Sequence, residues 1–115
     1  MLVIPWLFAI VLASLDEVAL SLLLRREYAE QRSIWESDGK PRGAFWIPQE
    51  CRTRWYVTYT SGRAGRALWA KWLFKTPEWI ANDAGSQKLL RVHRILLPAF
   101  VVAVVAPFVI AALLQ

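Results

Sequence analysis

The sequence contains a single cysteine and a single histidine among its 115 residues. Because Cys51 has no partner, a disulfide within the chain, a CxxC motif and a cysteine-based zinc site are all excluded. His93 has no second histidine with which to hold a metal or a haem, so we expect it to be an interfacial polar residue. The sequence also lacks a glycine-rich phosphate loop and a nucleophile elbow. These absences predict a protein that is not an enzyme and that carries no metal or cofactor.

Basic residues are missing from both ends of the chain. All 14 lysines and arginines lie between Arg25 and Arg94, and the apolar residues, 57% of the total, gather outside that interval. Soluble proteins are about 45–50% apolar. Two apolar ends around a polar centre predict an all-α membrane protein, with transmembrane helices at residues 1–24 and 92–115 that form a hairpin. Residues 25–91 are then a basic, aromatic and mostly helical cytoplasmic segment, which we call the middle segment.

The second predicted span has the stronger signal. After Arg94 the chain continues with 20 apolar residues, 95–114. A helix of that length covers about 30 Å, the thickness of the hydrocarbon core of a bilayer. A helix that is apolar on every side needs lipid or the centre of a large protein around it, and a chain of 115 residues cannot supply the second. We expect Pro98 and Pro107 to kink this helix without breaking it.

Two adjacent acids, Asp16 and Glu17, interrupt the first span. A charge near the centre of a bilayer costs about 2.5–3.5 kcal/mol on insertion scales. The acids can face a partner in protonated or paired form, or the span can end near Ser14 with the helix continuing along the surface. A cleaved signal peptide is the third interpretation, but the chain begins without a positive charge. We favour the first, in which the acids form a proton or ion site or pair with Arg25 or another basic residue.

Small and polar residues form one stripe along each predicted span. Stripes of this kind allow two helices to approach each other closely. We expect the two stripes to meet, within one chain or between chains, with Pro107 as a further member of the second. The residues expected to make this intramembrane contact are Ala9, Ala13, Asp16, Glu17, Ser21, Ala99, Ala103 and Ala111.

Positive charge flanks both spans on the side of the middle segment. Arg25 and Arg26 follow the first span, and Arg91 and Arg94 stand at the start of the second. Such a bias places the charged side in the cytoplasm. We therefore expect a multi-pass protein of the bacterial inner membrane, with the middle segment in the cytoplasm and both termini outside.

Residues 63–75 are amphipathic at helical spacing. Leucine and tryptophan fall on one side with lysine and arginine around them, which is typical of a helix that lies in the membrane interface. Such a helix binds anionic lipid headgroups, whereas nucleic acid is not expected because no groove-reading motif accompanies the charge. The same spacing suits a helix packed on the rest of the middle segment. The residues expected at the lipid interface are Arg63, Arg66, Trp69, Lys71, Trp72 and Lys75.

Three further expectations concern local structure. Residues 25–36 should extend the first helix out of the membrane, to an end near Ser37. Residues 52–60 are rich in β-branched and aromatic residues, which suits a strand, but no second strand is evident to pair with it, so a helix is the alternative. Thr76 and Ser86 are expected to cap the two helices that follow.

Four short motifs follow one another in the middle segment. They are Ile34-Trp35, Gly39-Lys40-Pro41, Trp55-Tyr56-Val57-Thr58-Tyr59 and Glu78-Trp79-Ile80. With one span at each end and a basic centre, this layout resembles the universal stress protein B family of small bacterial inner-membrane proteins. The resemblance covers most of the chain in layout, and it implies a stress-associated membrane protein without catalytic residues.

These features together predict a small integral membrane protein, not an enzyme, that acts through helix–helix contact with a membrane partner or with itself. Two alternatives stay open. An accessory subunit of a respiratory, photosynthetic or transport complex would use Asp16 and Glu17 to pair with a neighbouring subunit. A holin-like pore would use the same acids to line a water path.

Overall fold

The computed structural model describes residues 3–115, so residues 1 and 2 of the predicted first span lie outside it. In chain order the elements are α1 (Val3–Glu30), α2 (Arg32–Ser37), the 3-10 helix η1 (Gln49–Cys51), α3 (Trp55–Lys71), α4 (Glu78–Ala81) and α5 (Ala84–Leu113). The described part of the chain contains no strand. The strand alternative for residues 52–60 is therefore wrong, and the prediction of an all-helical fold is confirmed.

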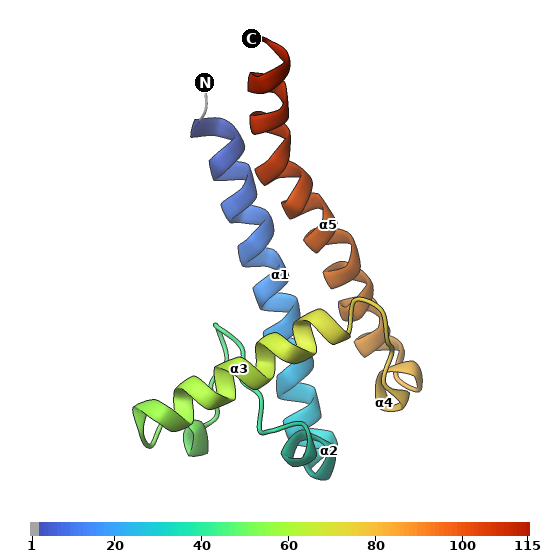
Figure 1. The fold of residues 1–115 in the computed structure, drawn as a ribbon. Coiled ribbons are helices and arrows are strands. Elements are labelled where there is room, and N and C mark those ends of the chain that lie inside the picture. Colours follow the sequence, from blue (N-terminus) through green and yellow to red (C-terminus); the bar gives the residue numbers. More distant parts are fainter. Residues whose placement is uncertain (1–2) are drawn as a thin grey trace.

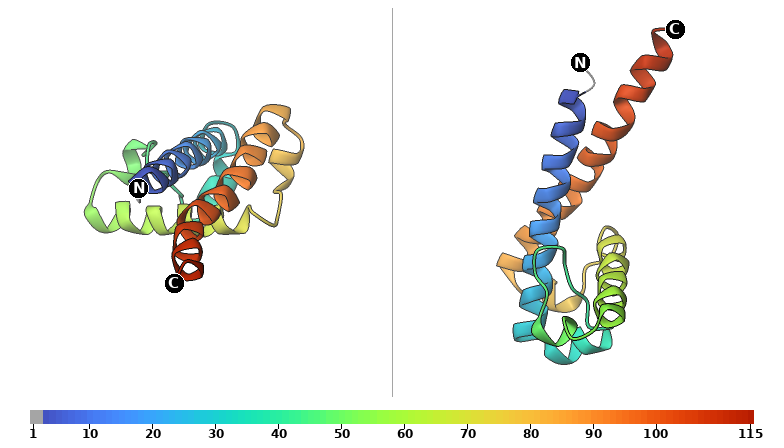
Figure 2. Two further views of the ribbon diagram at one scale, coloured as in Figure 1. Left: turned by 90° about the horizontal axis from the view of Figure 1, so that it is seen from above. Right: turned by 90° about the vertical axis from the view of Figure 1, so that its left-hand side faces the viewer.

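The two long helices, α1 and α5, lie side by side and run in opposite directions, so that both termini lie at one end of the molecule (Figure 1). Both are long and apolar enough to cross a membrane. Within the most apolar stretch of each, 44% of the residues of α1 are buried but only 6% of those of α5. The shorter helices gather at the other end, where α3 runs across the pair (Figures 1 and 2).

The first helix does not continue unbroken to Ser37. α1 ends at Glu30, and α2 begins after Gln31, whose backbone leaves the helical region with a φ of −130°. The Arg32 side chain donates from Nε to the Tyr28 carbonyl at 2.8 Å. In an unbroken α-helix that carbonyl accepts from the Arg32 backbone N–H. The predicted end near Ser37 is confirmed, but a break at Gln31 precedes it.

The start of α5 is capped by Asp83, and this corrects the expectation for Ser86. The Asp83 carboxylate accepts hydrogen bonds from the Ser86 backbone N–H at 3.1 Å and from its hydroxyl at 2.5 Å. These bonds, helped by Arg26 at 3.1 Å, lower the pKa of Asp83. Thr76 caps nothing either, because α4 begins after Pro77 without a side-chain cap. α5 then continues through Pro98 and Pro107 without a break, as predicted.

Asp83→Ala should lower the free energy of unfolding by about 1 kcal/mol, because the first N–H groups of a helix lose their acceptor. Asp83→Asn keeps an acceptor oxygen and should recover most of the loss. Denaturation in mild detergent, followed by circular dichroism, measures both. Equal losses for alanine and asparagine would contradict the capping role.

The apolar core lies where the short helices meet the ends of α1 and α5 that are distant from the termini (Figure 1). Its side chains come from both long helices, from α4, and from α3 with the residue after it. They are Leu20, Leu23, Leu24, Leu68, Trp72, Trp79, Ile80 and Leu90. This end of the molecule therefore has an apolar core of its own. Near the termini, by contrast, most apolar side chains of α1 and α5 are exposed.

The amphipathic helix buries its apolar face in this core. Trp72 is 2% exposed, and its ring meets that of Trp79 edge-on with the centroids 6.1 Å apart. This corrects the expectation that Trp72 lies at the lipid interface. Trp72 and Leu68 instead pack inside the protein, as the alternative interpretation of this helix predicted. The helix is also longer than expected at its start, and it ends at Lys71. The flanking basic side chains stay exposed: Arg63, Arg66, Lys71 and Lys75.

Candidate functional site

A polar junction, made by Asp16, Trp69 and His93, joins the three longest helices. Asp16 on α1 is 3% exposed. Its Oδ2 accepts a hydrogen bond from the Trp69 indole Nε1, on α3, at 2.8 Å. Its Oδ1 lies 2.5 Å from Nδ1 of His93, on α5. One carboxyl group thereby connects α1 to both other helices.

His93 is fully buried and uses both ring nitrogens. Its Nε2 lies 2.8 Å from the Trp69 carbonyl oxygen, which can only accept, so Nε2 carries a proton. A second proton is required between Nδ1 and Asp16 Oδ1, since two facing acceptors would repel. The pair is either imidazolium with carboxylate or imidazole with carboxylic acid, and it is neutral overall in both forms. The expectation that His93 is an interfacial residue is wrong: it is a partner of Asp16 inside the fold.

Glu17 forms an ion pair with Arg66 of α3. The Glu17 side chain is 17% exposed and that of Arg66 is 50% exposed, so this pair lies at the edge of the polar junction. The Arg66 guanidinium also lies over the Trp69 ring, 5.3 Å from its centre, within the range of a cation–π contact. Glu17 Oε2 is buried without a hydrogen-bond partner. The two acids therefore do pair within the chain, but with His93 and Arg66 in place of Arg25.

The end of α3 docks on α5 through two basic side chains. His93 lies against the Trp69 carbonyl, and Arg94 Nε donates to the Trp72 carbonyl at 2.9 Å. Arg94 Nη2 also donates to Thr76 Oγ1 at 2.8 Å. The last carbonyls of a helix lack partners within it and carry partial negative charge, which basic groups offset. These contacts fix the position of α3 across the two long helices.

The stripe of small residues on α1 faces protein, but not α5 alone. Ala9 and Asp16 are buried and Ala13 is partly buried. Ser21 is buried against the segment that follows α2, where its Oγ accepts a hydrogen bond from the Phe45 backbone N–H at 3.2 Å. This end of the stripe therefore holds the middle segment instead of a second membrane helix.

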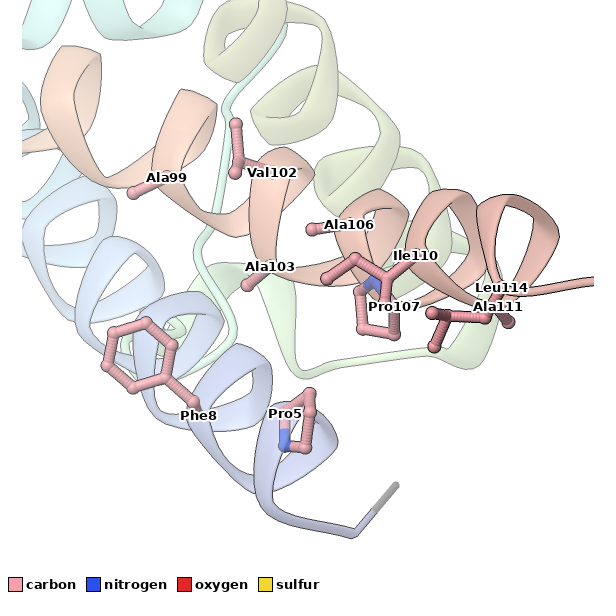
Figure 3. Close-up of a pocket in the computed structure, with 10 residues that line it drawn as sticks. All are labelled: Pro5, Phe8, Ala99, Val102, Ala103, Ala106, Pro107, Ile110, Ala111 and Leu114. Carbon is pink, nitrogen blue, oxygen red and sulfur yellow. The ribbon is translucent and has the colours of Figure 1, made fainter. Parts of the chain in front are cut away.

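The stripe on α5 lines a groove of about 770 Å³ between α5 and the start of α1 (Figure 3). Ala99 and Ala103 are partly exposed and Ala111 is exposed. Pro5 and Phe8 of α1 line the opposite side of the groove. The two long helices separate towards their termini (Figure 2), which leaves this apolar groove open. The two stripes therefore do not pack against each other along their whole length.

Glu27 is a second buried acid, on α1 beyond Arg25 and Arg26 and so outside the apolar run that ends at Leu24. Its side chain is 0% exposed, and neither carboxyl oxygen has a hydrogen bond of good geometry. Burial, and after it the neighbouring Asp38 carboxyl, raise the pKa of Glu27 from 4.5 to about 9. Glu27 therefore keeps its proton at neutral pH.

Stability should fall as the pH rises from about 4.5 to about 9, because over that window the folded state holds a proton on Glu27 that the unfolded state has released. The contribution is complete below pH 4.5 and is lost as the pH passes the folded value. The slope is at most about 1.4 kcal/mol per pH unit. Glu27→Gln should flatten it, whereas Glu36→Gln, on the exposed side of α2, should not. Unfolding at pH 5 and pH 8 tests this, and an unchanged slope in Glu27→Gln would contradict it.

The hydrogen bonds of the polar junction hold three helices together. Between residues 3 and 115, no group of three or more His, Cys, Asp or Glu side chains is arranged to hold a metal ion. Cys51 is buried, with its Sγ 3.2 Å from the Ser61 hydroxyl oxygen, so its thiol is enclosed. Asp16 and His93 are closed off from solvent. What the polar junction does is fix α3 to α1 and α5.

Comparison with known proteins gives no relative: no protein-family model matches the chain, and no curated protein or solved structure matches it either.

Proposed function

We propose that this chain is a small integral membrane protein that crosses the membrane twice, through α1 and α5, and that is not an enzyme. The surface of α5 supports this most strongly. Only 6% of its most apolar stretch is buried, so side chains such as Val102, Phe108 and Ile110 cover its outside, at 56–64% exposure. Apolar surface of this extent on a soluble monomer would promote association, whereas lipid accommodates it.

The middle segment faces the cytoplasm in this proposal and both termini lie outside, as the charges beside the spans favour. A reporter that is active only in the cytoplasm should be inactive when fused after Gln115 and active when inserted at Gly39, in the exposed turn after α2. The reverse pattern would contradict the orientation. The bacterial inner membrane and a stress-associated role, which the resemblance to universal stress protein B implies, belong to the same proposal.

The mode of action is contact between α5 and α5 of a second copy. The groove is bordered by small residues, Ala99 and Ala103 among them, and small residues let helices approach closely. Next to it α5 carries an exposed ridge formed by Val105 and Val109, one helical turn apart and 48% and 49% exposed. A helix that has both a groove and a ridge can pair with a copy of itself about a two-fold axis, each ridge entering the other groove.

Ala103→Phe should weaken this dimer about tenfold, because overfilling a packed contact costs about 1–3 kcal/mol. Ala112→Phe is the matched control, since Ala112 is exposed on the same helix, does not line the groove and is not in the row of Val105 and Val109. Native mass spectrometry of the protein in mild detergent measures the dimer fraction. A monomeric wild-type protein, or equal losses in the two variants, would contradict the α5–α5 contact.

The two alternative functions lose their main support. Both assigned Asp16 and Glu17 to a task outside the chain, and both acids have partners within it. Stable co-purification of the protein with a large complex would favour the accessory subunit over the self-associating protein. Release of a dye from liposomes that contain the purified protein would favour the pore.

A further inference from the structure

A second hollow lies between the segment that follows α2 and the middle of α3. It has a volume of about 260 Å³, which is large enough for several water molecules. Among the described residues, those that line it include no acid. They are Arg42, Gly43, Ala44, Tyr59, Gly62, Arg63 and Arg66. We call this hollow the arginine pocket.

Arg42, which lines the arginine pocket, is held in place by hydrogen bonds. Its Nε donates to the Thr58 carbonyl at 2.9 Å and its Nη1 to the Gly43 carbonyl at 3.2 Å. Its backbone N–H donates to the Ser61 carbonyl at 3.1 Å. The remaining nitrogen, Nη2, lies over Gly62, where an added Cβ would come within 2.9 Å of it. Arg42 is therefore pre-organised, and no carboxylate in the described chain forms a salt bridge with it.

The other two arginines of the pocket come from α3. Arg63 is exposed, with its guanidinium 6.0 Å from the centre of the Tyr59 ring. It has no salt bridge with an acid of the described residues, whereas Arg66 is paired with Glu17. Three guanidinium groups thus face one hollow with a single carboxylate beside them. No other acid of the described residues forms a salt bridge with these three arginines, so the remaining excess of positive charge would attract an anion.

The kind of anion follows from the donors. A guanidinium presents parallel N–H groups that match the oxygens of a phosphate and can bind two at once. Several arginines around one hollow suit a tetrahedral group with oxygens in more than one direction. A phosphate, free or as part of a larger molecule, fits this chemistry.

The surroundings favour the phosphate of a lipid. The segment that forms one wall of the arginine pocket is bound to Ser21 of α1, one turn before the apolar run ends, through the Phe45 backbone N–H at 3.2 Å. Phe45 is 62% exposed, and Tyr56 and Tyr59 on α3 are 48% and 60% exposed. Exposed aromatic side chains at the end of a membrane span are typical of the headgroup layer. The arginine pocket is therefore at the depth where lipid phosphates lie if α1 crosses the membrane.

We propose that the arginine pocket binds the phosphate of an anionic phospholipid on the cytoplasmic face of the membrane. The inference rests on the proposed membrane insertion. It keeps the lipid contact expected for Arg63 and Arg66, adds Arg42 to it, and leaves out Trp72, which is buried in the core. Bound lipid would join the segment after α2 to α3 and so secure α3 from the side opposite the core.

Native mass spectrometry of the full-length protein in detergent tests the proposal, with phosphatidic acid, phosphatidylglycerol and phosphatidylcholine as separate probes. Both anionic lipids should bind about tenfold more tightly than phosphatidylcholine. Arg63→Gln should remove most of that preference, a loss of about tenfold that reflects one charge-assisted contact. Lys71→Gln is the matched control because Lys71 is an exposed basic residue of α3 outside the arginine pocket. It should change binding less than twofold.

Three results would overturn the proposal. Equal losses in Arg63→Gln and Lys71→Gln would show diffuse attraction to the basic surface instead of a pocket. Inorganic phosphate that competes with the lipid at equal concentration would assign the site to a soluble anion. An absence of preference for anionic lipid would remove the site. Alkaline extraction of the same protein separates this from failure of the proposed function: an integral protein without the preference refutes the arginine pocket alone.

Discussion

Asp16→Leu should lower the free energy of unfolding by about 3 kcal/mol and free α3 from the two long helices. The change leaves two buried groups without a hydrogen-bond partner: the Trp69 indole N–H loses its acceptor, and His93 Nδ1 loses its contact with the Asp16 carboxyl group. A buried polar group without a partner costs about 1–3 kcal/mol. Leucine would at the same time favour insertion of α1, because it removes a charge from the span. Folding and insertion should therefore respond in opposite directions.

Asp16→Asn is the control that separates geometry from charge. The asparagine oxygen can accept from Trp69, and its amide can donate to Nδ1 of a neutral His93 whose Nε2 keeps its proton. We expect a loss below about 1 kcal/mol for this variant, in line with hydrogen bonds between membrane helices. Denaturation in mixed micelles, followed by the fluorescence of the tryptophans, measures both variants. Equal destabilisation by asparagine and leucine would contradict the hydrogen bonding described for the polar junction.

Gly65→Ala should destabilise the fold by about 2 kcal/mol, although alanine is the better helix former by about 1 kcal/mol. Gly65 is buried where α3 crosses the Arg42 backbone, and an added Cβ would collide with the Arg42 carbonyl oxygen. The Arg42 carbonyl oxygen is part of the main chain, which is bonded on both sides, so it cannot move aside as the end of a side chain can. Overpacking of this kind costs about 1–3 kcal/mol or more, which exceeds the gain in helix propensity.

Gly62→Ala, on the same helix, is the matched control. There the added Cβ would meet only the end of the Arg42 side chain, at 2.9 Å. That guanidinium is held by two hydrogen bonds, so moving it aside has a cost. The gain in helix propensity of about 1 kcal/mol offsets part of this cost, and Gly62→Ala should be much less destabilising than Gly65→Ala. Thermal unfolding in detergent compares the two. A Gly65→Ala protein as stable as Gly62→Ala would show that α3 does not pack on the segment around Arg42 as described.

Composition was enough to predict the two long helices. An apolar run such as residues 95–114 predicts a helix whatever it packs against. A single segment in lipid has no water to bind its backbone N–H and C=O groups, and only a helix satisfies them within the segment. The same holds for the all-helical class, because the single strand-like segment, residues 52–60, had nothing to pair with. These are local properties, and the structure agrees with them.

The partners of the polar residues could not be predicted in the same way. Asp16 and His93 are 77 residues apart, and helical spacing gives no information on which residue of α5 faces α1. The sequence did contain one indication of this pair. Asp16 and His93 are both polar residues in or beside apolar runs, and such residues commonly pair with each other because a hydrogen bond between them offsets the free-energy cost of burying each. Trp72 was misassigned for a related reason. An apolar helical face suits a membrane and a protein core equally, and only the fold distinguishes them.

Extraction of isolated membranes with alkaline sodium carbonate tests the central claim, that α1 and α5 seat the protein in the bilayer, most directly. The treatment strips proteins held on a surface by charge and leaves those that span the lipid. We predict that the intact chain stays in the pellet together with a known integral protein. Recovery of the full-length chain in the soluble fraction would contradict the account, whatever the fate of the polar junction or the arginine pocket.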